Sequence, residues 1–225
     1  MDAVRITRKN LNGKVPLIGF AGSPWTLATY MVEGMGSRNF RAVKELIYSH
    51  PKDAHVLLDK IARAVAAYLS AKIEAGAQAV QIFDTWGGIL PPDEFKEFSL
   101  RYIQQVLTLL KRNGAPVIVF CKDCGHSLEA IAETGCDVVG IDASVDIGKA
   151  RMLIGSQVAL QGNLDPMMLY ASPERIRDGV KKILEKFGTG SGHIFNLGHG
   201  ILPDVPVEHA KAFVQAVQEE SKKYH

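Results

Sequence analysis

The fold is decided by residues 19–34, which read GFAGSPWTLATYMVEG. The apolar run at 16–21 that leads into this segment has the length and the bounding residues of a buried strand. A glycine at 22 and a proline at 24 then break the strand, and apolar side chains follow at helical spacing. We expect Trp25 to pack in the core and Tyr30 to carry its hydroxyl above the end of the strand. The segment therefore predicts a strand, a turn and the start of a helix.

Strands and helices alternate along the rest of the chain. The expected strands lie at 16–21, 79–84, 116–121, 138–142, 157–161 and 193–197. The expected helices lie at 2–12, 39–48, 51–75, 91–113, 127–134, 146–154 and 173–187, with a last one that begins at 206. Apolar strands that are each followed by a helical crossover form a parallel sheet covered by helices. The chain is therefore predicted to be α/β.

Polar side chains follow nearly every expected strand, as they do at the carboxyl ends of barrel strands. They are Ser23, Asp84, Thr85, Lys122, Asp123, Asp142, Gln161, Asn163, Asn196 and His199. An open doubly wound sheet would gather such residues at only a few strand ends, near the point where the strand order reverses. The pattern therefore favours a (β/α)8 barrel of the TIM type. Of the acidic residues, we expect Asp84 and Asp142 to pair with lysines or helix termini rather than to act as acids.

The number of strands indicates that this barrel is incomplete. A closed TIM barrel has eight strands and about 250 residues, whereas the sequence shows about six βα units. We expect these units to form a single domain over residues 1–225.

The composition argues against several classes of function. The chain has 225 residues, of which 47% are hydrophobic, and this is enough for one sizeable core. Its formal net charge is +2 and its basic residues are dispersed, so neither nucleic acid nor a membrane is an expected partner. No glycine-rich phosphate loop follows a strand, which argues against nucleotide binding. Three cysteines and a start without an apolar leader segment predict a soluble protein of the reducing cytoplasm.

Four segments carry a resemblance to a known family. They are residues 19–34, FDTWGG at 83–88, LQGNLDP at 160–166 and NLGHGI at 196–201. Together they resemble the uroporphyrinogen decarboxylase family. The resemblance covers essentially the whole chain, but only the carboxyl-terminal two thirds of the family's sequence. The family's amino-terminal arginine loop and the strand with its catalytic aspartate have no counterpart here, so we expect an inactive or partial form of the enzyme.

The resemblance implies a carboxy-lyase that works without a cofactor. The family removes carbon dioxide from the four acetate side chains of uroporphyrinogen III and gives coproporphyrinogen III, in porphyrin and haem biosynthesis. By motif position, Tyr30, Thr85 and His199 would donate hydrogen bonds to carboxylates of this tetrapyrrole, and Phe83 would place its ring against the macrocycle. No catalytic residue and no metal ligand is assigned in this chain, because the family's aspartate and arginines belong to the absent segment. The resemblance also implies a homodimer.

A cysteine pair leaves one alternative open. Cys121, Cys124 and His126 stand at the end of the third expected strand, with a spacing that can bind zinc. The same superfamily contains zinc-dependent corrinoid methyltransferases, which carry a further cysteine in the loop after the last strand. In that loop this chain has His199 within the sequence NLGHG, which resembles the decarboxylases. We therefore expect the cysteines to be a pair of thiols in the core and not zinc ligands.

A second alternative is a non-catalytic fragment or binding remnant. If two βα units are missing, the first and sixth strands have unpaired edges and neighbouring apolar faces. Such edges and faces favour pairing with other chains. We therefore expect the chain to associate with itself.

Overall fold

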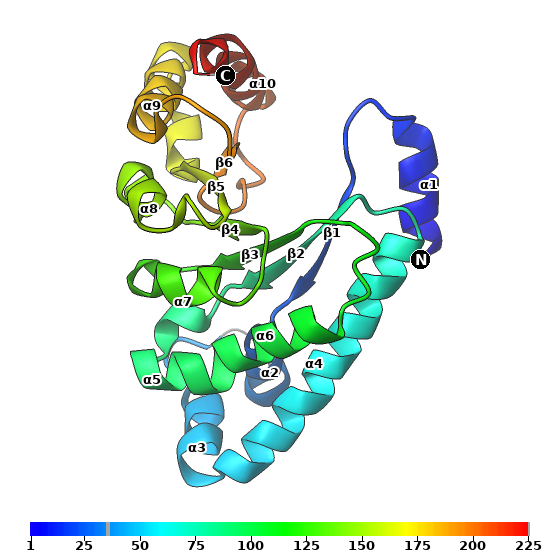
Figure 1. Ribbon diagram of the computed structural model, residues 1–225. Coiled ribbons are helices and arrows are strands. Elements are labelled where there is room, and N and C mark those ends of the chain that lie inside the picture. Colours follow the sequence, from blue (N-terminus) through cyan, green and yellow to red (C-terminus); the bar gives the residue numbers. More distant parts are fainter. Residues whose placement is uncertain (35–36, 225) are drawn as a thin grey trace. The chain divides into compact units, whose positions relative to one another are not determined.

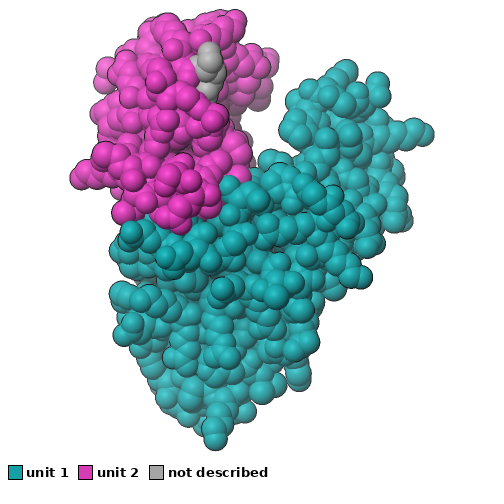
Figure 2. All heavy atoms as spheres, viewed as in Figure 1, with its two compact units in different colours: residues 1–137 teal, residues 138–225 magenta. Residues whose placement is uncertain are grey.

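The computed structural model describes residues 1–34 and 37–224 of the chain. The chain divides into two compact units, residues 1–137 and 138–225, which Figure 2 shows in teal and magenta. Each unit contains strands of its own and the helices that cover them. That the two units belong to a single domain remains a prediction.

The first unit is built on three parallel strands (Figure 1). They are β1 (Ile18–Gly22), β2 (Ala79–Asp84) and β3 (Val117–Cys121). The longer helices of the unit are α1 (Asp2–Leu11), α2 (Pro24–Glu33), α3 (Arg41–Ser49), α4 (Pro51–Glu74) and α6 (Arg101–Leu109). The shorter helical segments are η1 (Gly87–Ile89), α5 (Pro92–Glu94), η2 (Phe95–Leu100), η3 (Gly125–Ser127) and α7 (Leu128–Ala132).

The core of the first unit lies between the strands and helices α2, α4 and α6. Helix α4 packs against β1, β2, α2 and α6, and buries the apolar face of Leu58, Ile61, Val65 and Leu69. Trp25 on α2 is completely buried, which confirms its expected place in the core. Successive side chains of β1 point to opposite faces, so Ala21 is buried whereas Phe20 remains 57% exposed.

The prediction of one long regular helix at 91–113 is wrong, because the helix is interrupted and ends earlier. It begins as α5, widens into the π-helical segment η2, and continues as α6 only to Leu109. The wide segment holds Phe95, Phe98 and Ser99 in the interior together. Helix α6 ends because Leu110 adopts an extended backbone, with ψ 125°. Apolar spacing did not reveal these interruptions, since the same residues would also face inward in a regular α-helix.

The second unit also contains three parallel strands. They are β4 (Val138–Gly140), β5 (Ala159–Leu164) and β6 (His193–Leu197), with β5 paired to both of the others. The helical segments are α8 (Ile147–Ile154), η4 (Pro166–Tyr170), α9 (Pro173–Phe187), α10 (Val207–Glu220) and η5 (Ser221–Lys223). A core cluster joins the end of β5 to α9 and α10 through Leu164, Val180, Leu184 and Ala216.

The fifth strand is displaced from its predicted position at 157–161. The strand runs from Ala159 to Leu164, so Gln161 and Asn163 lie within it and not beyond its end. Both side chains are buried. Two polar residues in a short run hid the carboxyl half of the strand from a reading based on apolar residues. The bounds of the other five strands agree with the expected ones to within two residues.

The fold class is confirmed as an incomplete barrel of βα units. The described residues contain six strands, with helical segments after each one, and every strand is parallel to its neighbours within its unit. In the part of the chain that the structure describes, β1 pairs with β2 alone and β6 with β5 alone, so the strands do not close into a ring. None of the described helices is both long enough and apolar enough to cross a membrane.

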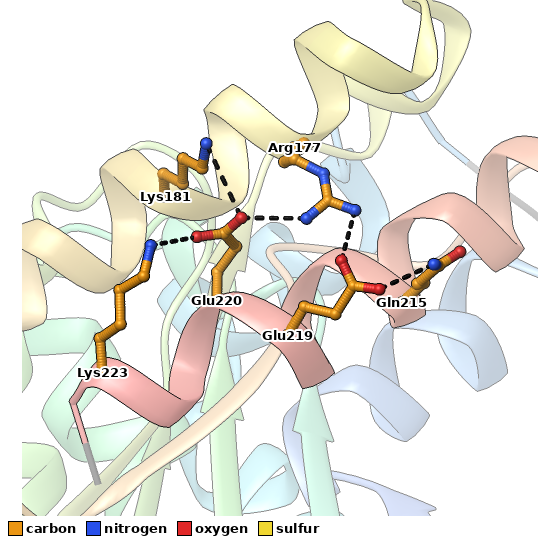
Figure 3. Close-up of polar contacts among 6 residues, drawn as sticks. All are labelled: Arg177, Lys181, Gln215, Glu219, Glu220 and Lys223. Atoms are coloured by element: carbon orange, nitrogen blue, oxygen red, sulfur yellow. Dashed lines mark hydrogen bonds and ion pairs between the residues drawn. The ribbon is translucent and has the colours of Figure 1, made fainter.

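A network of ion pairs joins α10 and η5 to α9 in the second unit (Figure 3). Glu220 accepts from Lys223 at 2.8 Å and from Arg177 at 2.9 Å, and Lys181 lies 3.7 Å away. Arg177 also reaches Glu219 at 2.6 Å. The hydrogen bonds from Lys223 and Arg177 lower the pKa of Glu220 from its ordinary 4.5 to about 2. Glu220 is itself only 8% exposed, so this network fixes the end of α10 on α9.

We predict that this network stabilises the second unit in a pH-dependent way. Because folding lowers the pKa of Glu220, its contribution is fully present above about pH 4.5 and is lost as the pH falls through about 2. Glu220→Gln should therefore lower the denaturation midpoint at pH 6, and the difference from the parent chain should shrink toward pH 2.

The control is Glu208→Gln, which removes the partner of Lys211 from an exposed pair on the same helix. It should change the midpoint little at either pH. Equal effects of the two substitutions at pH 6 would contradict the role of Glu220.

Candidate functional site

A buried carboxylate lies at the carboxyl end of β2 in the first unit. Asp84 is completely buried, and it accepts hydrogen bonds from three hydroxyls. Its Oδ1 accepts from Ser23 Oγ at 2.7 Å and from Thr26 Oγ1 at 2.9 Å, and its Oδ2 accepts from Ser99 Oγ at 2.5 Å. Burial raises the pKa of Asp84, and the three hydroxyls oppose that rise because they stabilise the charged form.

The expected partners of Asp84 were a lysine or a helix terminus. The helix terminus is correct, because Ser23 is the N-cap of α2 and accepts a hydrogen bond from Thr26 N at 3.0 Å. The lysine is wrong, since the described side chains that donate to this carboxylate are hydroxyls. Sequence reasoning missed Ser99, which lies in the π-helical segment η2, 15 residues after Asp84.

The loop after β2 is fastened to α2 by its backbone. Trp25 Nε1 donates to the carbonyl oxygen of Trp86 at 2.9 Å, and Trp86 N donates to Thr26 Oγ1 at 3.3 Å. One step earlier, Ser23 N donates to the carbonyl oxygen of Phe83 at 2.8 Å. The amino end of α2 and the carboxyl end of β2 therefore form one hydrogen-bonded junction around Asp84.

This junction leaves no room for a side chain at residue 87. A Cβ atom on Gly87 would lie 2.4 Å from Asp84 Oδ2 and 2.9 Å from Phe95 Cε2. Gly88 is equally confined, because its Cβ would lie 2.7 Å from the carbonyl oxygen of Lys122. The two glycines of the sequence FDTWGG are thus required by close packing at the end of β2.

Three of the four predicted site residues belong to the same end of the first unit. Tyr30 lies on α2 with 46% of its surface exposed, and the edge of its ring meets Trp86 at a centroid distance of 6.4 Å. Phe40 packs on Trp86 at 4.7 Å. Thr85 lies directly before Trp86 and is half-buried. Trp86 therefore lies next to both residues: its ring contacts the ring of Tyr30, and its backbone directly follows Thr85.

Phe83, the third of these residues, lies in a row of aromatic rings. Its ring is 5.8 Å from that of Phe20 on β1 and 5.8 Å from that of Phe120 on β3, in edge-on arrangements. The strand register explains the row, because Phe83 pairs with Phe120 and its other neighbour is Gly22, two residues beyond Phe20. The row gives the strands of the first unit a partly exposed apolar face, to which Phe20 contributes most.

The fourth predicted residue, His199, belongs to the second unit. It is exposed and follows β6. The preceding Gly198 donates its N–H to the carbonyl oxygen of Leu164 at 2.7 Å, and a Cβ there would lie 2.4 Å from Ala143 N. The backbone before His199 is thus held tightly against the ends of β4 and β5. That His199 shares one site with Tyr30, Phe83 and Thr85 remains a prediction.

Polar side chains also organise the strand ends of the second unit. Asp142 Oδ1 accepts from Ser144 N at 2.7 Å and from Ser144 Oγ at 2.5 Å, and its pairing with a lysine or a helix terminus stays a prediction. Asn163 Nδ2 donates to the carbonyl oxygens of Asp142 and Val145, both at 2.7 Å. A groove of about 500 Å3 lies beside them, and its charged residues carry both signs, including Asp146, Lys182 and Lys186. This mixture of charges does not define one class of ligand.

The cysteine pair lies in the interior of the first unit. Cys121 and Cys124 are buried and reduced, as expected for core thiols. The hydrogen bond from Cys124 and burial hold the pKa of the Cys121 thiol well above its usual value. His126 is exposed, with its ring 6.5 Å from that of Phe95. Among residues 1–34 and 37–224, no three His, Cys, Asp or Glu side chains are placed to hold a metal ion.

Comparison with known proteins identifies the family. The family model for uroporphyrinogen decarboxylase (URO-D) matches residues 1–220, nearly the whole chain. The chain belongs to the uroporphyrinogen decarboxylase family. This confirms the resemblance that the four sequence segments carry.

Curated members of the uroporphyrinogen decarboxylase family match the chain from end to end. The uroporphyrinogen decarboxylase of Hydrogenovibrio crunogenus is 58% identical over 229 aligned residues, which cover 100% of this chain and 65% of that protein. The corresponding protein of Actinobacillus pleuropneumoniae serotype 5b is 59% identical with the same coverage. The chain thus spans about 65% of the length of these relatives.

Two solved structures of other proteins have a fold similar to that of this chain. A methyltransferase from Methanosarcina mazei superposes with a TM-score of 0.84 at 24% identity, over 96% of this chain and 62% of that one. A B12-independent methionine synthase from Shewanella sp. W3-18-1 superposes with a TM-score of 0.66 at 13% identity, over 99% and 65%. At such identities these likenesses concern the fold alone, and they support a TIM-barrel type.

We predict that Gly87→Ala destabilises the chain by about 1–3 kcal/mol, the usual cost of adding a methyl group where no space exists. The added Cβ would collide with the Asp84 carboxylate, which cannot retreat from its three hydroxyls. Chemical denaturation monitored by circular dichroism measures the effect. Gly200→Ala is the matched control, because a Cβ there meets nothing within 4 Å. A change at Gly87 as small as that at Gly200 would contradict the packing argument.

Proposed function

We propose that the chain is the part of a uroporphyrinogen decarboxylase that holds one wall of the tetrapyrrole cleft. The observation that carries the proposal is the family match over residues 1–220, together with 58% identity to a curated decarboxylase along the whole chain. The geometry of the first unit supports it, because two hydroxyl-bearing residues and an aromatic row gather at one end of the strands. The reaction is the decarboxylation of the four acetate side chains of uroporphyrinogen III to give coproporphyrinogen III.

The chemistry explains why hydroxyls and aromatic rings are useful here. Loss of carbon dioxide from an acetate on a pyrrole leaves a poor carbanion unless the ring accepts the electron pair. Protonation of the pyrrole makes it such an acceptor, so the proposed reaction draws on the substrate itself and needs no cofactor. The remaining task of the protein is to hold a flexible macrocycle with eight carboxylates in one orientation.

Each proposed binding residue suits one part of that substrate. The hydroxyls of Tyr30 and Thr85 would donate hydrogen bonds to carboxylates, as would the imidazole of His199. The ring of Phe83 would lie against the apolar face of the macrocycle, next to the exposed ring of Phe20. The aspartate that would hold the pyrrole N–H groups and the arginines for the other carboxylates belong, in this proposal, to the part of the family's sequence that the chain does not match.

The proposal extends to the cellular context of the reaction and to the association of the chain with itself. Porphyrin and haem biosynthesis in the cytoplasm is the proposed context, with a tetrapyrrole as the partner and neither nucleic acid nor a membrane. Self-association, most simply as a homodimer, would cover the free edges of β1 and β6. We also propose that both units act as a single domain of this enzyme.

We predict that the chain binds coproporphyrin, the stable oxidised form of the proposed product, and that Tyr30→Phe and Thr85→Val each weaken this binding. Each substitution removes one hydroxyl donor to a carboxylate, so the dissociation constant should rise about fivefold or more. Titration of the porphyrin's fluorescence measures it. Tyr48→Phe is the control, since Tyr48 is an exposed tyrosine on α3 outside the proposed wall.

Two results would contradict the proposal. If the parent chain did not bind coproporphyrin, the chain would not form a wall of a tetrapyrrole-binding cleft. Turnover of uroporphyrinogen by the purified chain would show that the catalytic groups are not confined to the unmatched part of the family's sequence.

A further inference from the structure

The strand end that carries Thr85 and the helix that carries Tyr30 are joined by one buried side chain. Asp84 precedes Thr85 directly in the chain. Its Oδ1 receives both Ser23 and Thr26, which stand at the first turn of α2, the helix of Tyr30. This carboxylate oxygen therefore joins the end of β2 to the beginning of α2, beside the hydrogen bonds of Ser23 N to Phe83 and of Trp86 N to Thr26.

The second oxygen of the same carboxylate is fixed from the opposite side. Ser99 on η2 donates to Oδ2, and Gly87 brings the loop so close that even a Cβ would meet this oxygen. The carboxylate can neither rotate nor withdraw without breaking a hydrogen bond in a fully buried place. The Asp84 carboxylate therefore holds the end of β2 at a fixed place relative to α2 and η2.

Helix α2 carries this position to Tyr30. The helix begins at Pro24 with Ser23 as its N-cap, and Tyr30 lies less than two turns beyond Thr26. The indole of Trp86, one residue after Thr85, touches the ring of Tyr30. The segments of Tyr30 and Thr85 are thus joined by the Asp84 carboxylate, by the contact of Trp86 with Tyr30, and by the hydrogen bonds between Trp86 and the first turn of α2.

We propose that Asp84 is a positioning residue for tetrapyrrole binding, which fixes the hydroxyls of Tyr30 and Thr85 at the separation that two carboxylates of one macrocycle require. The inference rests on the proposed function for the identity of the ligand. Asp84 itself touches no substrate, because its side chain is completely covered by protein. Its effect on binding is exerted through α2 and through the end of β2.

The test compares three variants of the full chain. Asp84→Asn keeps the size of the side chain but replaces one acceptor oxygen with a donor. Ser99→Ala is the milder variant and decides the matter if Asp84→Asn does not fold, since it removes one donor and leaves Ser23 and Thr26 in place. Asp59→Asn is the matched control, because Asp59 on α4 also accepts side-chain hydrogen bonds, from Gln105 and Arg63.

Two readouts separate positioning from simple stabilisation. The first is the coproporphyrin dissociation constant of the folded protein, measured well below its melting temperature. The second is the ligand-free NMR spectrum, read at the Tyr30 ring in both variants and at the Thr85 methyl in Ser99→Ala, because a substitution of Asp84 alters the signals of its chain neighbour directly. For Asp84→Asn or Ser99→Ala we expect about tenfold weaker binding, the scale of one lost hydrogen bond to a charged group, and shifted signals at these positions. Asp59→Asn should change neither readout.

The outcomes decide the proposal even if the ligand is wrong. A purely structural role would lower the melting temperature, yet leave the affinity of folded molecules and both NMR signals unchanged, and that result overturns positioning by Asp84. If the parent chain binds no porphyrin, the proposed function fails and the NMR signals alone decide. Shifts at Tyr30 and Thr85 that are absent in the Asp59→Asn control then support the positioning role, and unchanged signals refute it.

Discussion

Hydrogen bonding of the buried Asp84 carboxylate is the constraint on which the first unit depends. A carboxylate in the interior is tolerated only when hydrogen bonds replace its lost water. Ser23, Thr26 and Ser99 supply three of them, from the turn after β1, the first turn of α2 and η2. Because these donors come from separate parts of the chain, the carboxylate is satisfied only when all of those parts are in place. The end of β2 is therefore held by three separate parts of the chain at once.

The second unit uses a related device at its own strand ends. Asn163, buried at the end of β5, donates from one amide nitrogen to the carbonyl oxygens of Asp142 and Val145 in the segment after β4. Gly198 N then fastens the end of β6 to the carbonyl oxygen of Leu164. In both units a buried polar side chain at a strand end holds a neighbouring loop. The regions that carry Tyr30, Thr85 and His199 are thus held by hydrogen bonds rather than by apolar packing alone.

The sequence was sufficient for the architecture because each strand contains a short apolar run. All six described strands were found, and the break at Gly22 and Pro24 correctly placed the change from β1 to α2. It failed where polar residues enter the interior. Gln161 and Asn163 concealed half of β5, and the π-helical segment η2 left the inward spacing of its residues unchanged.

The candidate site was predictable in its residues but less so in its construction. The motif positions pointed to Tyr30, Phe83 and Thr85, which the structure gathers at one end of the first unit. Nothing in the spacing of residues indicated that Ser99 would meet Asp84, because they are 15 positions apart and lie on different elements, η2 and β2. Likewise, a zinc-like spacing of cysteines said nothing of the burial of both thiols in the interior.

The most direct test of the central claim is to locate a bound porphyrin by NMR on the full chain. Intermolecular nuclear Overhauser contacts from coproporphyrin should reach the ring of Tyr30, the methyl group of Thr85 and the ring of Phe83 in the same complex. Such contacts would place one macrocycle across the end of the first unit. Contacts confined to other residues, with the signals of Tyr30 and Thr85 unmoved at saturation, would contradict the account.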